Sequence, residues 1–118
     1  MKVLLLEDDI ALSDLLNEHL IDNGYNVTLC SNGQDALECL IDEKFDLALL
    51  DINTPLMSGI DVLKTARTDY KNSTPAIILT AYQDTKHLKE SFESGVDDYI
   101  KKPFDLEELD QRILKLCR

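Results

Sequence analysis

The stretch Leu47-Ala48-Leu49-Leu50-Asp51 runs four apolar residues directly into an aspartate. Such a short, unbroken apolar run, here at about 46–50, is typical of a strand buried on both faces of a parallel sheet. Four more short apolar runs lie at about 2–6, 26–30, 76–80 and 97–100. The sequence therefore predicts five strands, and the strand before Asp51 is among the most buried.

Segments with helical spacing of apolar residues separate these runs. Their apolar stripes are Leu12-Leu15-Leu16-Leu20, Ala36-Leu37-Leu40-Ile41, Ile60-Leu63-Ala66 and Leu106-Leu109-Ile113-Leu116, and a weaker helix is expected at about 83–94. Regular alternation of strand and helix predicts an α/β sandwich around a parallel sheet. Right-handed crossovers, with the first, third and fourth strands most buried, favour the strand order 2-1-3-4-5.

Three local signals mark the ends of helices. Gly24, which follows Asn23, predicts the end of the first helix, because glycine tolerates the left-handed backbone of a C-cap. Pro55 is predicted to lie in the first turn of the third helix. Asp105 with Glu108 predicts a cap at the start of the last helix.

Composition limits the class of protein. A chain of 118 residues, 44% of them apolar, suits a single domain at 1–118 with one core. No apolar run approaches the roughly 20 residues that span a bilayer, and the chain turns acidic by Glu7, where a signal peptide would stay apolar. We therefore expect a cytoplasmic protein without membrane contact. The net charge of -11 argues against direct binding of nucleic acid, since phosphate backbones attract basic surfaces.

The three cysteines, Cys30, Cys39 and Cys117, are odd in number and widely spaced, without a CxxC pair. This spacing supports neither a zinc site nor a disulfide framework. We expect reduced thiols that are buried or incidental.

Polar side chains follow four of the apolar runs, namely Glu7 and Asp8, Asp51, Thr80 and Lys102. Because parallel strands end at the same edge of a sheet, these side chains are expected to share one pocket. The three carboxylates would repel one another by on the order of 4 kcal/mol per pair at about 4 Å. A hard divalent cation such as Mg²⁺ relieves that repulsion, because it prefers oxygen ligands.

The same residues permit phosphate chemistry. Asp51 beside a metal can act as a nucleophile, since carboxylates form acyl phosphates. Lys102 would supply positive charge to phosphate oxygens, and Thr80 a hydroxyl donor. Each residue also has a structural reading: Lys102 alone is typical of a solvated surface, and Asp9 of a helix cap.

Four motifs in order then carry a resemblance to a known family: VLLLEDD at 3–9, DLALLDINTPLMSG at 46–59, ILTA at 78–81 and GVDDYIKKPF at 95–104. On these motifs the chain resembles the receiver domain of two-component response regulators over essentially its whole length. The resemblance implies a flavodoxin-like, three-layer α/β sandwich with a five-stranded sheet and five helices. It also implies a phosphoacceptor signalling switch, whose own chemistry is limited to self-phosphorylation and slow autodephosphorylation.

The resemblance implies a role for each acid of the site. Asp51 would accept a phosphoryl group from a sensor histidine kinase or a small acyl phosphate. Glu7, Asp8 and Asp51 would hold Mg²⁺ or Mn²⁺, together with the backbone carbonyl of Asn53.

The remaining motif residues would report the phosphorylation. Lys102 would pair with the aspartyl phosphate, in the family across a cis bond to Pro103, and Thr80 would hydrogen-bond the phosphate. Ala81 would leave room for Tyr99 to turn inward. Tyr99 by itself is equally typical of strand packing.

The C-terminal motif resembles the branch of the family whose receivers precede a winged-helix DNA-binding domain. The resemblance implies a homodimer on phosphorylation, with Asp97, Asp98, Glu108 and Arg112 at matching charged positions. Where that branch usually carries an arginine on the fourth helix, this chain has Leu88, for which Lys86 or Lys89 is a candidate substitute that lacks the planar fork of arginine. We expect a transcriptional output domain downstream of residue 118.

Three alternatives stay open at this stage. The chain could be a stand-alone regulator that acts by protein contacts, or a receiver-like domain that has lost phosphorylation. The third alternative, a phosphatase of the haloacid dehalogenase kind, would want an acid two residues after the nucleophile, where this chain has Asn53.

Overall fold

The computed structural model describes residues 1–81, 89 and 95–117. The strands are β1 (Lys2–Leu6), β2 (Asn26–Cys30), β3 (Leu47–Asp51), β4 (Ala76–Ala81) and β5 (Asp98–Lys102). The helices are α1 (Ile10–Asp22), α2 (Gly33–Asp42), α3 (Gly59–Asp69) and α5 (Leu106–Leu116). The helix expected at about 83–94 lies, apart from the exposed Lys89, outside the described residues.

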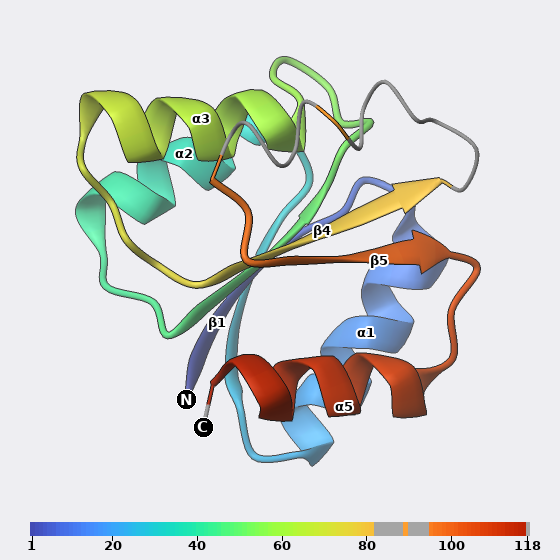
Figure 1. Cartoon of the computed structure of the whole chain (residues 1–118). Coiled ribbons are helices and arrows are strands. Elements are labelled where there is room, and N and C mark those ends of the chain that lie inside the picture. Colours follow the sequence, from blue (N-terminus) through green and yellow to red (C-terminus); the bar gives the residue numbers. More distant parts are fainter. Residues whose placement is uncertain (82–88, 90–94, 118) are drawn as a thin grey trace.

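All strand pairs are parallel, and the strand order is β2-β1-β3-β4-β5, as predicted. Helices α2 and α3 cover one face of the sheet, and α1 and α5 cover the other (Figure 1). The α/β sandwich and the strand order expected from the sequence are therefore confirmed.

The sheet separates two apolar clusters. In β3 every residue is buried, and alternate residues face opposite ways: Leu50 joins the cluster under α2 and α3, whereas Leu49 joins the cluster under α1 and α5. This explains the unbroken apolar run, because a strand covered on both faces has no solvent side.

Polar caps fix where the helices begin, and this sets the loops around the site. The side chains of Asp9, Asn32, Ser58 and Asp105 each accept a hydrogen bond from a backbone N–H in the first turn of the following helix. Such caps satisfy donors that the helix itself leaves free. The predicted cap at Asp105 and the left-handed Gly24 (φ 89°) after α1 are confirmed.

The prediction for Pro55 was wrong. Helix α3 begins only at Gly59, with Ser58 as its cap. Leu56 has a positive φ of 70°, which a helix does not allow, and the Thr54 hydroxyl donates to the carbonyl of Met57 at 2.7 Å. Pro55 thus belongs to a turn that carries the chain from β3 to α3.

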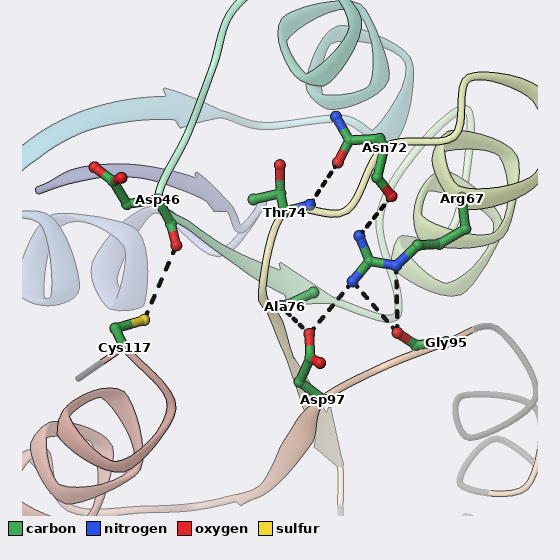
Figure 2. A network of polar contacts seen from close by, with 8 residues as sticks. All are labelled: Asp46, Arg67, Asn72, Thr74, Ala76, Gly95, Asp97 and Cys117. Atoms are coloured by element: carbon green, nitrogen blue, oxygen red, sulfur yellow. Dashed lines mark hydrogen bonds and ion pairs between the residues drawn. The ribbon is translucent and has the colours of Figure 1, made fainter.

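A polar network ties the end of α3 to the start of β5 (Figure 2). The guanidinium of Arg67 donates to the carbonyls of Asn72 (2.9 Å) and Gly95 (3.3 Å) and to the carboxylate of Asp97 (3.3 Å). Asp97 also accepts the backbone N–H of Ala76 at 2.8 Å. One side chain therefore joins three separate backbone segments.

Arg67→Ala is expected to lower the free energy of unfolding by about 2 kcal/mol, because hydrogen bonds from a charged donor to two carbonyls and a carboxylate are lost together. Urea unfolding measures this change. Lys64→Ala, at an exposed position of the same helix, is the matched control and should alter stability by less than about 0.5 kcal/mol. Equal effects of the two substitutions would show that the network adds no stability.

Candidate functional site

The sheet register brings the predicted acids together. Leu6 of β1 pairs with Leu50 of the adjacent strand β3. The residues that follow them, Glu7 and Asp51, therefore lie next to each other at the same edge of the sheet. Ligand oxygens of Glu7, Asp8 and Asp51 lie within 4.8 Å of one another. The shared acidic pocket expected from the strand ends is therefore present.

The turn after β1 sets the positions of these acids. The backbone N–H of Glu7 donates to the carbonyl of Cys30 at 3.1 Å, which extends the β1–β2 ladder by one residue. Its carboxylate accepts the N–H of Asp9 at 3.3 Å, and Asp9 in turn caps α1. Glu7 is only 2% exposed and Asp51 5%, whereas Asp8 faces solvent.

Lys102 reaches into the pocket from the end of β5. Its ammonium lies 2.7 Å from Oε1 of Glu7 and 3.2 Å from Oδ1 of Asp51. The bond from Lys102 to Pro103 is cis. Lys102 thus supplies part of the positive charge that the repulsion between the carboxylates requires. When all three acids are ionised, one ammonium leaves two negative charges unbalanced.

Burial decides the ionisation of Asp51. Loss of water raises the pKa of Asp51 to about 7, with a further rise from the charge of Glu7, although the charge of Lys102 pulls the other way. Burial also acts to lower the pKa of Lys102, but its hydrogen bond to Glu7 and the charge of Asp51 outweigh burial and raise that pKa. Lys102 therefore stays protonated. Because Asp51 shares this one ammonium with Glu7, the charge of Lys102 does not offset the effect of burial on the pKa of Asp51.

Without metal, stability is expected to fall as the pH rises through the range in which Asp51 ionises. The raised pKa of folded Asp51 means that the folded chain holds a proton that the unfolded chain has lost, between about pH 4 and pH 7. The contribution is therefore complete below about pH 4 and is lost progressively as the pH rises to about 7, a change of on the order of 4 kcal/mol. Urea unfolding in the presence of a chelator measures it.

Asp51→Asn is the reference for that measurement, because an amide does not titrate in this range. The stability of the wild type should approach that of the variant at low pH and fall below it at pH 8. If the free energies of unfolding of the wild type and of the variant differed by the same amount at low pH and at pH 8, the raised pKa of Asp51 would be contradicted.

The donor set fits a hard divalent cation. Mg²⁺ uses one or two carboxylates together with waters and phosphate oxygens at near-octahedral positions. Asp51 and Glu7 offer buried carboxylate oxygens, and the exposed Asp8 leaves a side open to solvent for water ligands. The backbone carbonyl of Asn53, in an exposed loop position two residues after Asp51, stays a predicted further ligand.

The predicted reporter residues lie next to the acids. Thr80 is 2% exposed near the end of β4, and its hydroxyl donates to the carbonyl of Ala81 at 3.1 Å. Ala81 pairs with Lys102 across the sheet and is exposed. Tyr99 is half-buried and packs against the apolar cluster under α2 and α3, so strand packing accounts for part of its role.

Two glycines at the site were not singled out from the sequence. A Cβ atom built on Gly59 would overlap the carbonyl oxygen of Asp51, and one on Gly33 would overlap the carbonyl oxygen of Met57. Both glycines lie at the first position of a helix, where sequence signals favour caps over close packing. Only the three-dimensional approach of helix to strand shows why they must lack a side chain.

A groove of about 570 Å³ opens beside Lys102. It is mostly apolar and is lined by residues of the α1 start and of the segment after β5: Asp9, Ala11, Leu12, Leu15, Ala81, Lys102, Pro103 and Phe104. The groove was not expected from the sequence, because its walls combine residues 9–15, 81 and 102–104, which lie far apart along the chain.

The charged residues assigned to a dimer face have partners within the chain. Arg112 lies 2.8 Å from Asp98 and 3.6 Å from Glu108, and Asp97 is held by Arg67. Lys89 is exposed. A dimer that used these charges would have to exchange internal ion pairs for intermolecular ones.

A sequence model described as "Response regulator receiver domain" matches residues 3–114. The chain is 46% identical over 112 residues to the transcriptional regulatory protein CrdR of Helicobacter pylori, across 95% of this chain and 53% of that protein. It is 42% identical over 117 residues to the transcriptional regulatory protein CpxR of Escherichia coli, across 99% and 49%. The chain thus spans about half the length of these curated relatives.

Solved structures share the fold. The receiver domain of the Francisella response regulator 1452 is similar with a TM-score of 0.89 and 34% identity, over 98% of this chain and 94% of that one. The receiver domain of the sensor histidine kinase PA1611 from Pseudomonas aeruginosa has a TM-score of 0.90 and 26% identity, over 98% and 96%, and contains a magnesium ion in its active site cleft. In the described part of the present chain, no helix has the length and apolar character needed to cross a membrane.

Proposed function

The chain belongs to the response regulator receiver domain family, and from this premise we propose that Asp51 is its phosphoryl acceptor. Members of this family are signalling switches rather than conventional enzymes, which removes the phosphatase alternative. The observation that carries the proposal is the buried Asp51 carboxylate, 3.2 Å from the Lys102 ammonium and grouped with Glu7 and Asp8.

The pocket can assist phosphoryl transfer through its own side chains. An oxygen of Asp51 attacks phosphorus, the bond from phosphorus to the donor nitrogen or acyl oxygen breaks, and the donor leaves with the bonding electrons. Lys102 is close enough to Asp51 to balance charge on the transferred group. A bound Mg²⁺ would add charge neutralisation on the phosphoryl oxygens.

Glu7 and Asp8 are proposed to hold that Mg²⁺, or Mn²⁺, with Asp51 and the carbonyl of Asn53. The support is the negative charge that Lys102 leaves unbalanced once all three acids are ionised, together with carboxylate oxygens that lie within 4.8 Å of one another. The magnesium ion in the cleft of the PA1611 receiver is a parallel in a related domain.

We further propose that a sensor histidine kinase is the donor. The open side of the pocket at Asp8 and the apolar groove next to Lys102 together leave room for a phosphohistidine and the protein surface around it. Phosphorylation would then bias a two-state equilibrium around Thr80 and Tyr99, because the hydroxyl of Thr80 has a weaker partner in Ala81 than a phosphate would be.

Control of a transcriptional output domain is proposed from the relatives. CrdR and CpxR are named transcriptional regulatory proteins, and this chain corresponds to about half of each. The acidic net charge of -11 is consistent with a domain that leaves DNA contact to another part of a protein. A homodimer through Asp97, Asp98, Glu108, Arg112 and Lys89 stays a proposal.

Incubation with acetyl phosphate and Mg²⁺, followed by peptide mapping, tests the proposed function. We expect one hydroxylamine-labile phosphoryl group, on the peptide that contains Asp51. A stable phosphoryl group on a serine, threonine or histidine, with Asp51 unmodified, would contradict the assignment.

Mg²⁺ is expected to raise the melting temperature of the metal-free chain. At about 100 times the dissociation constant, a ligand of the folded state adds about 2.7 kcal/mol, or on the order of 10 °C for a chain of this size. Asp8→Asn should remove most of this rise, whereas Asp14→Asn, at an exposed position of α1, should retain it. Scanning calorimetry with and without a chelator distinguishes these outcomes, and an equal rise in all three proteins would place the ion elsewhere.

A further inference from the structure

Two of the three cysteines meet at the end of the sheet, although nine positions separate them in the sequence. Cys30 is the last residue of β2 and Cys39 lies in α2, and their sulfur atoms are 3.8 Å apart. Both are free thiols. The fold therefore creates a dithiol that the sequence spacing did not indicate.

The two sulfurs differ in access. Cys30 is 7% exposed within the apolar cluster under α2 and α3, whereas Cys39 is half-buried at the edge of the same cluster. Reagents from solvent therefore meet Cys39 first, and Cys30 is placed to react with whatever group Cys39 then carries.

We propose that Cys30 and Cys39 are a modification site at which small, uncharged disulfides form an intramolecular disulfide. The Cys39 thiolate attacks one sulfur of the reagent and releases the other half as a thiol. Cys30 gives up its proton, attacks the sulfur of Cys39 and releases the second half as a thiol. Two protein thiols are oxidised, and the reagent is reduced to two thiols.

The two sulfur atoms are already in van der Waals contact. The sulfurs have to approach from 3.8 Å to about 2 Å. Because α2 follows β2 directly through the cap residue Asn32, the bridge closes a short loop and does not cross the sheet.

Charge selects the reagent. Burial, with added repulsion from Cys39, Asp35 and Glu43, raises the pKa of Cys30 to about 12, which agrees with Cys30 reacting second. The chain as a whole carries a net charge of -11. Anionic disulfides such as glutathione disulfide are therefore repelled, and neutral ones such as hydroxyethyl disulfide are not.

Cys117 is an internal control. Its thiol lies 3.9 Å from the carbonyl of Asp46 (Figure 2). The residue packs against the apolar cluster on the opposite face of the sheet. It is half-buried like Cys39, so exposure alone would give the two residues similar reactivity.

The test treats the folded chain with hydroxyethyl disulfide in mildly alkaline buffer and maps the products by mass spectrometry. We expect a monomer that has lost two hydrogens, with residues 30 and 39 in one cross-linked peptide, also in Cys117→Ser. Glutathione disulfide at equal concentration and low salt should react more slowly, and added salt should narrow the difference.

Two variants resolve the order of the reaction. Cys30→Ser should stop at a mixed disulfide on Cys39, whereas Cys39→Ser should leave Cys30 unmodified over the same time. A dominant product at Cys117, covalent dimers, or the same mixture of pairings from folded and urea-unfolded chain would overturn the proposal. The last comparison needs no variant and so does not depend on variants that fold poorly.

Discussion

Asp51→Asn is expected to remove phosphoryl labelling by acetyl phosphate to below detection. The variant keeps the size and hydrogen-bonding capacity of the side chain but has no carboxylate oxygen to attack phosphorus. Among the described residues of the pocket, Glu7 is held more closely by Lys102 than Asp51 is, at 2.7 Å against 3.2 Å, and no ion pair to Lys102 is seen for Asp8. Phosphoryl labelling should therefore be lost completely. Removal of a residue that only assists the reaction would instead reduce the rate of labelling in part.

The matched control is Asp69→Asn, at an exposed position at the end of α3. It removes one carboxylate from the surface and should leave labelling unchanged. Asp51→Asn should also be at least as stable as the wild type at pH 8 without metal, so loss of the fold cannot account for loss of labelling. Continued labelling of Asp51→Asn at an undiminished rate would rule out Asp51 as the acceptor.

Gly59→Ala is expected to destabilise the chain by about 3 kcal/mol or more. A Cβ atom at this position would lie 2.9 Å from the carbonyl carbon of Asp51 and would overlap its oxygen. Backbone atoms cannot rotate away, so the start of α3 has to move off the end of β3. Helix propensity alone predicts the opposite sign, because alanine favours a helix over glycine by about 1 kcal/mol.

Gly24→Ala is the comparison variant, because it introduces backbone strain without the atomic overlap expected at Gly59. Gly24 has a positive φ of 89° and no neighbour within 4 Å of the added atom, so the cost should be about 1 to 2 kcal/mol. Urea unfolding of both variants gives the comparison. If Gly59→Ala were the milder change, the close packing of α3 against Asp51 would be wrong.

The sequence predicted the fold because its signals were local and repeated. Strands β1, β3 and β4 are short apolar runs, whereas β2 and β5 mix apolar and polar residues. Because parallel strands end at the same edge of a sheet, the meeting of Glu7 with Asp51 was expected from the strand order. The order of the strands came from burial, because β3 carries apolar residues toward both faces.

Features that depend on side-chain reach could not be predicted in the same way. Lys102 was correctly predicted at this edge of the sheet. That its ammonium lies closer to Glu7 than to Asp51 could be learned only from the three-dimensional distances. The turn at Pro55 was misassigned because a proline suits either a first helical turn or a loop, and the positive φ of Leu56 decides between them. The Arg67 network and the Cys30–Cys39 pair join residues whose sequence separation carries no signal.

Strand β5 is anchored at both ends, and the two anchors differ in kind. Asp97, immediately before the strand, is bound to Arg67 and to the backbone of Ala76, and the last residue, Lys102, is bound to Glu7 and Asp51. The proposed phosphorylation of Asp51 would change the charge that faces Lys102, whereas the contacts of Asp97 with Arg67 and Ala76 do not involve Asp51. A change at Asp51 would therefore act on the C-terminal end of β5, while Arg67 and Ala76 hold the residue before its N-terminal end. Tyr99 lies between these two ends of the strand.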